Sequence, residues 1–474
     1  MTLARVTRRA FFDATLRAII GVAFVERDGV AARAQQASSS GPLIVHSARP
    51  QDLETPVNLL TSWITPNDLF YVRSHFYTPT IDEARWVLQV DGDVATPLTL
   101  TLDDIMRMPQ RTLPVTLECA GNGRGNYEPR VAGVQWRKGA VGTARWTGVP
   151  LADVLKRAGR RPSGTFIWFD GADIGLGRAP DFIRSLPLDK AIHRDTLLAY
   201  EMNGERLPIA HGFPLRVVVP GWEGAYNVKW VTRITVSDRE HPGPFVSASY
   251  RVPRWPVMPG AKVDAADTVP IRGLVVKSII TSPLDGANLL PGRATMITGF
   301  AWGGEYDIRT VDVSSDGGRT WAAARLGQER APYAWRQFTL PWGPDHPGSR
   351  MLLSRATDVR GRRQPLAADW NPGGYLWNAV DMVRVNVGES GLAAAPSHLT
   401  APQPAPVAPP PDTDAAAGLL KSRCTVCHST DLIEAQRLDE DGWRRELAKM
   451  TGWGAQVLAE ERDLLLDYLL RRSP

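Results

Sequence analysis

The chain has 474 residues, of which 43% are apolar and 22% are charged. This composition is that of an ordinary globular protein and excludes wholesale disorder. The length is too great for a single hydrophobic core, so we expect about two to four domains. The net charge of +5 includes no stripe of lysine and arginine interleaved with aromatic residues, which argues against nucleic acid as a partner.

Residues 1–34 are typical of a twin-arginine-type signal peptide. The segment Thr7-Arg-Arg-Ala-Phe-Phe12 precedes a modest apolar stretch, and Ala32-Arg-Ala34 is a small-residue cleavage site. The alternative is an amphipathic surface helix, which Arg17 within the apolar stretch favours. We expect export of the folded protein to the periplasm. No later segment approaches the roughly 20 apolar residues of a membrane span, so none is expected in the mature chain.

Residues 50–265 mix helical and strand patterns, which predicts an α+β domain. Thr101 or Asp103 is placed to cap a short helix. Residues Leu151–Gly159 follow a proline and end on glycine, as helices do. The nearly all-apolar run Leu215–Val219 is typical of a buried strand.

Residues 270–386 change to short strands with frequent turn signals, which predicts an all-β sandwich of immunoglobulin type. Expected strands cover 294–300, 310–314, 335–339 and 351–355, and Asp316-Gly-Gly318 predicts a hairpin turn between two of them. Tryptophan is commoner in cores than at ligands, so we expect packing roles for three of them. These are Trp302, Trp321 and Trp335.

Residues 387–414 form a proline- and alanine-rich linker, and residues 415–474 predict a small all-α cytochrome c domain. Cys424 and Cys427 lie in a Cys-X-X-Cys-His segment, which attaches one covalent c-type haem through two thiols. His428 would be the proximal iron ligand, and Met450, the only later methionine, the sixth ligand. The alternatives are a zinc or redox Cys-X-X-Cys site and a core methionine.

Cys119 is the remaining cysteine and lies between a strand-like run and a glycine-rich loop that contains arginine. Nearby arginines favour the thiolate form, which is a suitable ligand for a soft or transition metal. The alternative is a buried, inert cysteine, against which the polar and glycine-rich flanks argue.

Several ordered motifs of residues 60–260 resemble the molybdenum domain of the sulfite oxidase family. Tyr71–His75 is similar to its Arg-Asn-His segment, and Glu118–Arg124 to its Cys-Ala-Gly-Asn metal loop. Gly142–Gly148 resembles its Gly-Thr-Ala-Arg-Trp segment, while His211–Arg216 and Asn227–Trp230 are similar to its pterin-binding strand and turn. Residues 270–386 resemble the family's dimerisation domain, which implies a homodimer.

The resemblance implies a molybdenum-molybdopterin cofactor with Cys119 as a metal ligand. It also implies that Arg73 and Arg124 bind substrate and that Tyr250 is an active-site hydrogen-bond donor. Arginine suits a small oxyanion because its planar donors match the oxygens. The residues implied to surround the pterin and its phosphate are Tyr71, Val72, Arg73, Ser74, His75, Asp173, His211, Arg216, Asn227, Val228 and Lys229.

The implied activity is that of a sulfite dehydrogenase, which oxidises sulfite or a related sulfur oxyanion and sends electrons through the haem to a soluble cytochrome c or similar acceptor. Three departures reduce the implied positive charge of the pocket. Ala132 and Val380 stand where the family carries a lysine and an arginine, and Asn122-Gly-Arg124 replaces a doubled arginine. A sulfane dehydrogenase, or a reductase of nitrate or S-oxides, therefore remains an alternative. A binding module without metal is a further one, against which the joint presence of these site residues argues.

Overall fold

The computed structural model describes residues 42–388 and 413–472. The expected signal peptide and nearly all of the expected linker lie outside these residues and stay predictions. Within the two described ranges, no helix has the length and apolar composition needed to cross a membrane.

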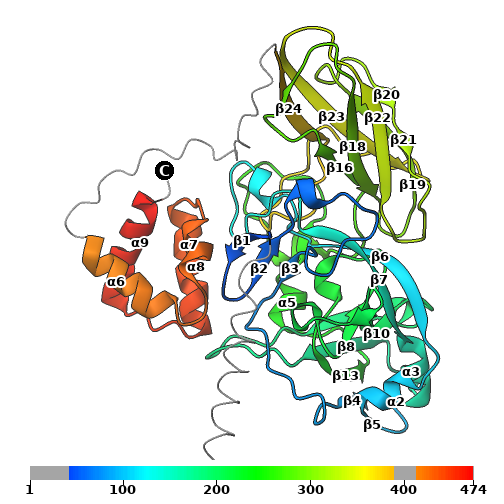
Figure 1. Ribbon diagram of the computed structural model, residues 1–474. Coiled ribbons are helices and arrows are strands. Elements are labelled where there is room, and N and C mark those ends of the chain that lie inside the picture. The colour runs from blue at the N-terminus through cyan, green and yellow to red at the C-terminus, as the bar shows by residue number, and fades with distance from the viewer. Residues whose placement is uncertain (1–41, 389–412, 473–474) are drawn as a thin grey trace, which may run out of the picture. The chain divides into compact units, whose positions relative to one another are not determined.

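The first domain is built from antiparallel sheets with one parallel pair, β4 with β13 (Figure 1). Its longest pair joins β6 (Arg111–Glu118) to β7 (Val141–Pro150), and Cys119 follows directly at the end of β6. The N-terminal sheet is β1 (Ile44–Ser47), β2 (Asp52–Glu54) and β3 (Val72–Arg73). The other strands are β4 (Leu88–Gly92), β5 (Leu98–Leu100), β8 (Phe166–Gly171), β9 (Arg184–Pro187), β10 (Leu197–Met202), β11 (Glu205–Arg206), β12 (Arg216–Val218), β13 (Val231–Ser237), β14 (Arg251–Pro253) and β15 (Thr268–Pro270).

Short helices join these strands, and the two expected from the sequence are present. Thr101 caps α2 (Leu102–Met106) through a capping box with Asp104. The helix α3 (Leu151–Arg157) begins after Pro150 and is followed by Gly159, whose φ of +64° suits glycine. The buried strand expected at residues 215–219 is present as β12, which covers the three central residues. The remaining short helices are η1 (Val57–Leu59), η2 (Arg124–Asn126), α4 (Leu188–Ala191), η3 (Ile209–His211), η4 (Gly224–Tyr226), α5 (Pro244–Ser247) and η5 (Ala265–Asp267).

The second domain consists of two β-sheets that enclose one apolar core (Figure 1, green to yellow). Ile280 and Phe338 of one sheet and Val311 and Val383 of the other belong to this core, so the expected two-sheet packing is present. One sheet is β16 (Lys277–Ser282), β18 (Thr295–Trp302), β22 (Arg336–Trp342) and β21 (Arg325–Leu326). The other is β17 (Asn288–Leu289), β24 (Asp381–Val387), β23 (Gly348–Asp358), β19 (Ile308–Ser314) and β20 (Ala322–Ala323).

One sequence expectation for this domain needs correction, whereas the packing role expected of Trp302 and Trp335 is confirmed. The turn at Asp316–Gly318 joins β19 to the two-residue strand β20 rather than to another of the expected strands. Trp302 and Trp335 are buried, but they pack in a seam against the first domain and not inside the sandwich. Trp321 is only partly buried and covers the guanidinium of Arg355.

A buried ion pair crosses this seam to the residue that precedes Cys119. Lys277 of β16 donates from Nζ to Oε1 of Glu118 at 2.9 Å and to the backbone oxygen of Asn122 at 2.9 Å. Trp302 donates to the other carboxylate oxygen of Glu118 at 2.7 Å. The second domain thus neutralises and fixes the base of the Cys119 loop.

The last part of the chain, described by itself, is helical (Figure 1, orange to red). Its helices share one apolar core that contains Leu420, Trp443, Leu465 and Leu469. The helix expected near the end, at residues 460–472, is present. The elements are α6 (Thr413–Cys424), α7 (Thr430–Glu434), α8 (Glu440–Trp453), η6 (Ala459–Glu461) and α9 (Arg462–Arg471).

Replacing Lys277 by methionine should lower the free energy of unfolding by about 3–5 kcal/mol, because the carboxylate of Glu118 is left buried without a cation. Denaturant unfolding measures this loss. The control Arg233→Met removes a pair whose arginine side chain is 53% exposed, and it should cost at most about 1 kcal/mol. Equal losses in the two variants would contradict the role given to Lys277.

Candidate active site

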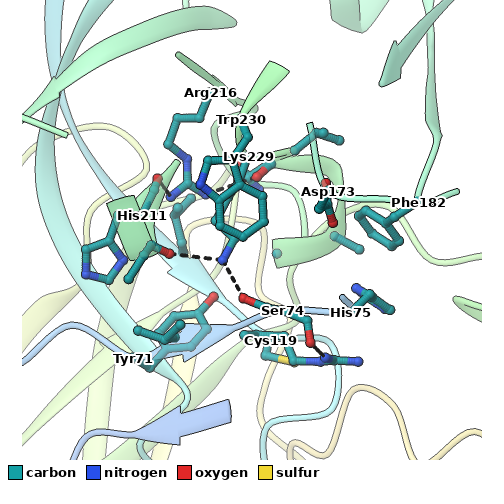
Figure 2. A pocket seen from close by; sticks show the side chains of 18 of the residues that line it. Tyr71, Ser74, His75, Cys119, Asp173, Phe182, His211, Arg216, Lys229 and Trp230 are labelled. Carbon is teal, nitrogen blue, oxygen red and sulfur yellow. Dashed lines mark hydrogen bonds between the residues drawn. The ribbon is translucent and has the colours of Figure 1, made fainter. Parts of the chain in front are cut away.

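A pocket opens between β3, the end of β6 and the segment from η3 to Trp230 (Figure 2). Every residue that the sequence analysis assigned to the pterin lines this pocket, and so do Cys119 and Tyr250. The lining residues that the sequence analysis did not name are Phe70, Leu117, Phe182, Ala210, Gly224 and Ala225.

The thiol of Cys119 reaches the pocket from the end of β6. The backbone N–H of Cys119 donates to the oxygen of Ala140 at 3.0 Å, which continues the pairing with β7 by one residue. Burial raises the pKa of the thiol, while the charges of Arg73 and Arg124 act in the opposite direction. The positive surroundings therefore favour a thiolate once a metal replaces its proton.

Arg216 is a buried cation that has no carboxylate partner. Its side chain donates to the backbone oxygens of His211 at 2.8 Å and Asn227 at 3.0 Å, and its buried Nε has no hydrogen-bond partner. Burial lowers its pKa to about 10, so the guanidinium stays charged at neutral pH. An uncompensated buried charge is costly, so this end of the pocket is built to receive an anion.

Lys229 adds a second cation beside Arg216 (Figure 2). Its Nζ donates to Oγ of Ser74 at 2.8 Å and to the oxygen of Ala210 at 3.0 Å. Burial lowers the pKa of Lys229, and the nearby charge of Arg216 lowers it further, whereas Asp173 raises it. A bound anion would hold Lys229 in its charged form, which suits a phosphate group.

His211 contributes a fixed, neutral imidazole. Its Nε2 lies 3.0 Å from the backbone oxygen of Asn67, which can only accept, so Nε2 carries the hydrogen. Burial lowers the pKa of His211 to about 3, with Arg216 adding to the effect. The ring is therefore uncharged across the physiological range.

Arg73 lies on β3, opposite Asp52 on β2. Its Nη1 donates to Oδ1 of Asp52 at 3.2 Å and to the backbone oxygen of Ser74. Burial by itself would lower the pKa of Arg73, but the charge of Asp52 outweighs it and the pKa is raised. The sequence analysis missed Asp52, because only the pairing of β2 with β3 brings it to Arg73.

Tyr250 and His75 form a hydrogen-bonded pair at 2.7 Å between the phenol oxygen and Nε2. Burial raises the pKa of Tyr250 well above its ordinary value and lowers that of His75, aided for His75 by Arg73 and Arg184. The phenol keeps its proton and the imidazole stays neutral. The φ of Tyr250 is +57°, a left-handed conformation that is rare for a bulky residue and common at functional sites.

A second buried network packs against Tyr250. The sequence analysis did not identify this network either. The guanidinium of Arg184 lies 4.3 Å from the ring centroid of Tyr226 and 4.8 Å from that of Tyr250. Its Nη2 is 3.5 Å from Oε1 of Glu223, which is fully buried. Burial raises the pKa of Glu223 to about 7, although Arg184 opposes the shift.

Arg124 is the one predicted active-site residue that does not line the pocket. Its Nη1 donates to the oxygen of Val134 at 3.1 Å, and Nε and Nη2 donate to the oxygen of Gly373 at 3.2 and 3.1 Å. These donors tie the Cys119 loop to neighbouring loops. The expected direct contact of Arg124 with substrate is therefore not supported by this geometry, and its influence on Cys119 is by charge.

The predicted haem residues lie at the junction of α6 and α7. Cys424 is the last residue of α6, Cys427 and His428 follow in the turn, and the two thiols are not joined in a disulfide. Nδ1 of His428 lies 3.2 Å from the backbone oxygen of Ser429, so Nδ1 donates and Nε2 is left for a ligand bond. Burial lowers the pKa of His428, with Lys449 adding to the effect, so the ring is neutral, as iron ligation requires. Met450 follows Lys449 on α8.

Family comparisons match the two domains separately. The oxidoreductase molybdopterin binding domain matches residues 75–245, and the Mo-co oxidoreductase dimerisation domain matches residues 268–388. The sulfite oxidase of Gallus gallus is 39% identical over 354 residues, which are 71% of this chain and 76% of that protein. An NADH nitrate reductase of Brassica napus is 32% identical over 74% of this chain, but only 42% of that protein is covered.

A solved structure also resembles the chain. The crystal structure of the sulfane dehydrogenase SoxCD from Paracoccus pantotrophus has a TM-score of 0.61 and 31% identity, and the match covers 73% of this chain and 88% of that one. The match to a dimerisation domain supports a homodimer. Both family matches end before the C-terminal helices begin.

The buried carboxyl of Glu223 predicts a pH effect on stability. Its pKa is about 7 when folded and near 4.3 when unfolded, so the folded state holds more protons between these values and stability falls as pH rises through them. In Glu223→Gln this contribution disappears. The difference in unfolding free energy between variant and wild type should grow in favour of the variant by up to about 1.4 kcal/mol per pH unit across this window. A difference that does not change with pH would contradict the raised pKa.

Proposed function

The chain belongs to the sulfite oxidase family of molybdopterin oxidoreductases, and from this membership we propose that it is a sulfite dehydrogenase. In this proposal it oxidises sulfite to sulfate at a molybdenum-pterin centre and passes the electrons through its own C-terminal c-type haem to an external acceptor. The observation that carries the proposal is the meeting of the Cys119 thiol with Arg73, Arg216 and Lys229 in one pocket.

The residues of the pocket fit the molybdenum-molybdopterin cofactor. The unpartnered Nε of Arg216 and the ammonium of Lys229 are donors for a phosphate, with Ser74 beside them. Cys119 would be the protein's ligand to the metal. When bound, the cofactor supplies oxygen-atom transfer and accepts the two electrons of the oxidation.

Substrate binding is assigned to the side of the pocket formed by Arg73 and Tyr250. Arg73 keeps Nε and Nη2 without a hydrogen-bond partner among the described residues, which leaves one edge of the guanidinium for an oxyanion. Tyr250 keeps its proton, and it can donate that proton to a substrate when Nε2 of His75 carries the hydrogen of their shared bond.

The haem is proposed from the Cys-X-X-Cys-His segment and the local geometry. Cys424 and Cys427 are available for covalent attachment, and His428 is held in the tautomer that leaves Nε2 for iron. Lys449 and Glu446 of α8 both act on the charge state of His428, so the helix that carries Met450 lies close to it. This supports His428 and Met450 as the residues that would hold the haem iron.

An external soluble cytochrome c, or a similar carrier, is the proposed acceptor, and the periplasm is the proposed location. Covalent c-type haem and a twin-arginine signal both belong to an exported protein, so the two features support each other. We also propose that the β-sandwich of the second domain is of the immunoglobulin type, as expected from the sequence.

A sulfane dehydrogenase is the second candidate. The structural match to SoxCD covers more of the matched chain than the sequence match to sulfite oxidase does. Ala132 and Val380 also stand where the family pattern has a lysine and an arginine, although neither residue lines the pocket. A nitrate or S-oxide reductase is less well supported, because the match to the nitrate reductase covers only 42% of that protein.

Adding sulfite to the purified, fully oxidised protein should reduce its haem, because oxidation and electron exit are proposed to lie in one polypeptide. The haem absorption bands, followed by stopped flow, measure this. Cys119→Ser should keep the haem but lose its reduction by sulfite. The double variant Cys424→Ser and Cys427→Ser should no longer hold haem covalently, so no haem should stay attached after denaturation. It should still oxidise sulfite with an artificial electron acceptor.

The opposite results separate the alternatives. If the wild-type haem stays oxidised although molybdenum and haem are both fully present, sulfite is the wrong substrate. Reduction by a sulfane donor such as a protein-bound persulfide would then favour the sulfane dehydrogenase. Oxidation of pre-reduced haem by nitrate would favour the reductase.

Arg216→Met should lower the molybdenum content of the purified protein at least about tenfold, since the anionic end of the cofactor loses its buried cation. Metal analysis against protein concentration measures this directly. Arg145→Met, which changes an exposed arginine on the neighbouring β7, is the control and should keep full molybdenum. Full occupancy of Arg216→Met would contradict its role as the anion site.

A further inference from the structure

We propose that Asp52 is a specificity-determining residue that keeps the substrate side of the pocket from holding doubly charged anions tightly. The inference rests on the proposed function in that Arg73 is taken to contact the oxyanion. It adds a residue from the N-terminal sheet, outside the motifs that carry the family resemblance.

Asp52 is placed by strand pairing. It lies on β2 directly opposite Arg73 on β3, and its side chain is 1% exposed. Oδ1 accepts from Nη1 of Arg73 at 3.2 Å and from the backbone N–H of Ser74 at 3.4 Å. The carboxylate therefore fixes one nitrogen of the guanidinium and leaves the other edge for a ligand.

Asp52 also cancels the charge of that guanidinium. Its second oxygen, Oδ2, is buried without a hydrogen-bond partner, and Arg73 is its ion-pair partner among the described residues. The other groups that act on Arg73 are the phenol of Tyr250 and the thiol of Cys119. Arg216, by contrast, has no carboxylate as an ion-pair or hydrogen-bond partner among the described residues. The guanidinium of Arg73 thus offers hydrogen-bond donors whose charge is balanced by a directly paired carboxylate, whereas that of Arg216 does not.

This difference acts on ligands according to their charge. Repulsion by the Asp52 carboxylate is twice as large for a dianion as for a monoanion at the same place. The attraction to the Arg73 guanidinium also doubles, so the carboxylate cancels most of the advantage that sulfate, the doubly charged product, would otherwise have over a monoanion. The geometry assigns Asp52 to product release and to discrimination among oxyanions.

The test compares two tetrahedral anions of different charge, sulfate and perchlorate, by isothermal titration calorimetry on the purified oxidised full-length holoprotein. Asp52→Asn retains an acceptor for Nη1 and removes the charge. We expect the Kd of sulfate to fall about tenfold and that of perchlorate only about threefold. Equal changes for the two anions, or no change, would overturn the proposal.

Two further variants test this interpretation, the first as a control and the second as an independent test. Asp91→Asn removes one negative charge from a surface pair with Arg233 and should change neither Kd. Arg73→Gln leaves Asp52 without its cation, so sulfate binding should weaken more than perchlorate binding. That second test holds even if Asp52→Asn fails to fold, and equal weakening of both anions there would also count against the proposal.

The outcome is separable from the proposed activity because anion binding is measured without turnover. If Asp52→Asn tightens sulfate binding but sulfite fails to reduce the wild-type haem, the role of Asp52 stands and sulfite is the wrong substrate. If sulfite reduces the haem and both Kd values are unchanged in Asp52→Asn, the specificity role is wrong and the activity stands.

Discussion

A guanidinium buried without a carboxylate is the constraint on which the pocket depends. Arg216 keeps its charge at neutral pH, yet the protein satisfies it only with backbone oxygens and leaves Nε without a partner. Its ring contact with Trp146, 4.7 Å from the centroid, holds the guanidinium but cannot neutralise it. The surrounding elements are arranged so that an anionic ligand completes the charge balance, and Lys229, Ser74 and His211 are grouped around the same space.

The two ends of the pocket differ in whether their arginine is paired with a carboxylate. At the Arg216 end the cation is uncompensated, which suits a permanently bound phosphate (Figure 2). At the Arg73 end a buried carboxylate accompanies the cation, which suits a ligand that must arrive and leave. Tight retention and turnover are thus separated by the placing of a single aspartate on a neighbouring strand.

Much of the site could be predicted from sequence because its residues occur in contiguous motifs. Residues 71–75, 211–216 and 227–229 each enter the pocket as a short segment, so recognising the segment was sufficient to place its side chains. Elements with strong local signals, such as the capping box at Thr101 and the glycine after α3, were also predictable. The capping box and the glycine follow from local chemistry, whereas the site segments were predicted through their resemblance to the family's motifs.

The residues that were missed depend on tertiary pairing. Asp52 meets Arg73 only because β2 pairs with β3, and Glu223 meets Arg184 across a separation in sequence that no local pattern encodes. Arg124 lies outside the pocket lining, with the carbonyls of Val134 and Gly373 accepting from its side chain, and its contact with substrate stays a prediction. Trp302 and Trp335 were correctly expected to be buried, but the sequence could not tell a sandwich core from a domain seam.

The buried pair between Glu118 and Lys277 has a consequence for the order of assembly. Its two residues are 159 positions apart, so the base of the Cys119 loop is complete only after the second domain has been synthesised and has packed onto the first. Contacts of such long range form late, because the entropy of closing the intervening chain must be overcome first. Maturation of the metal centre is therefore tied to the folding of a domain that contributes no side chain to the pocket lining.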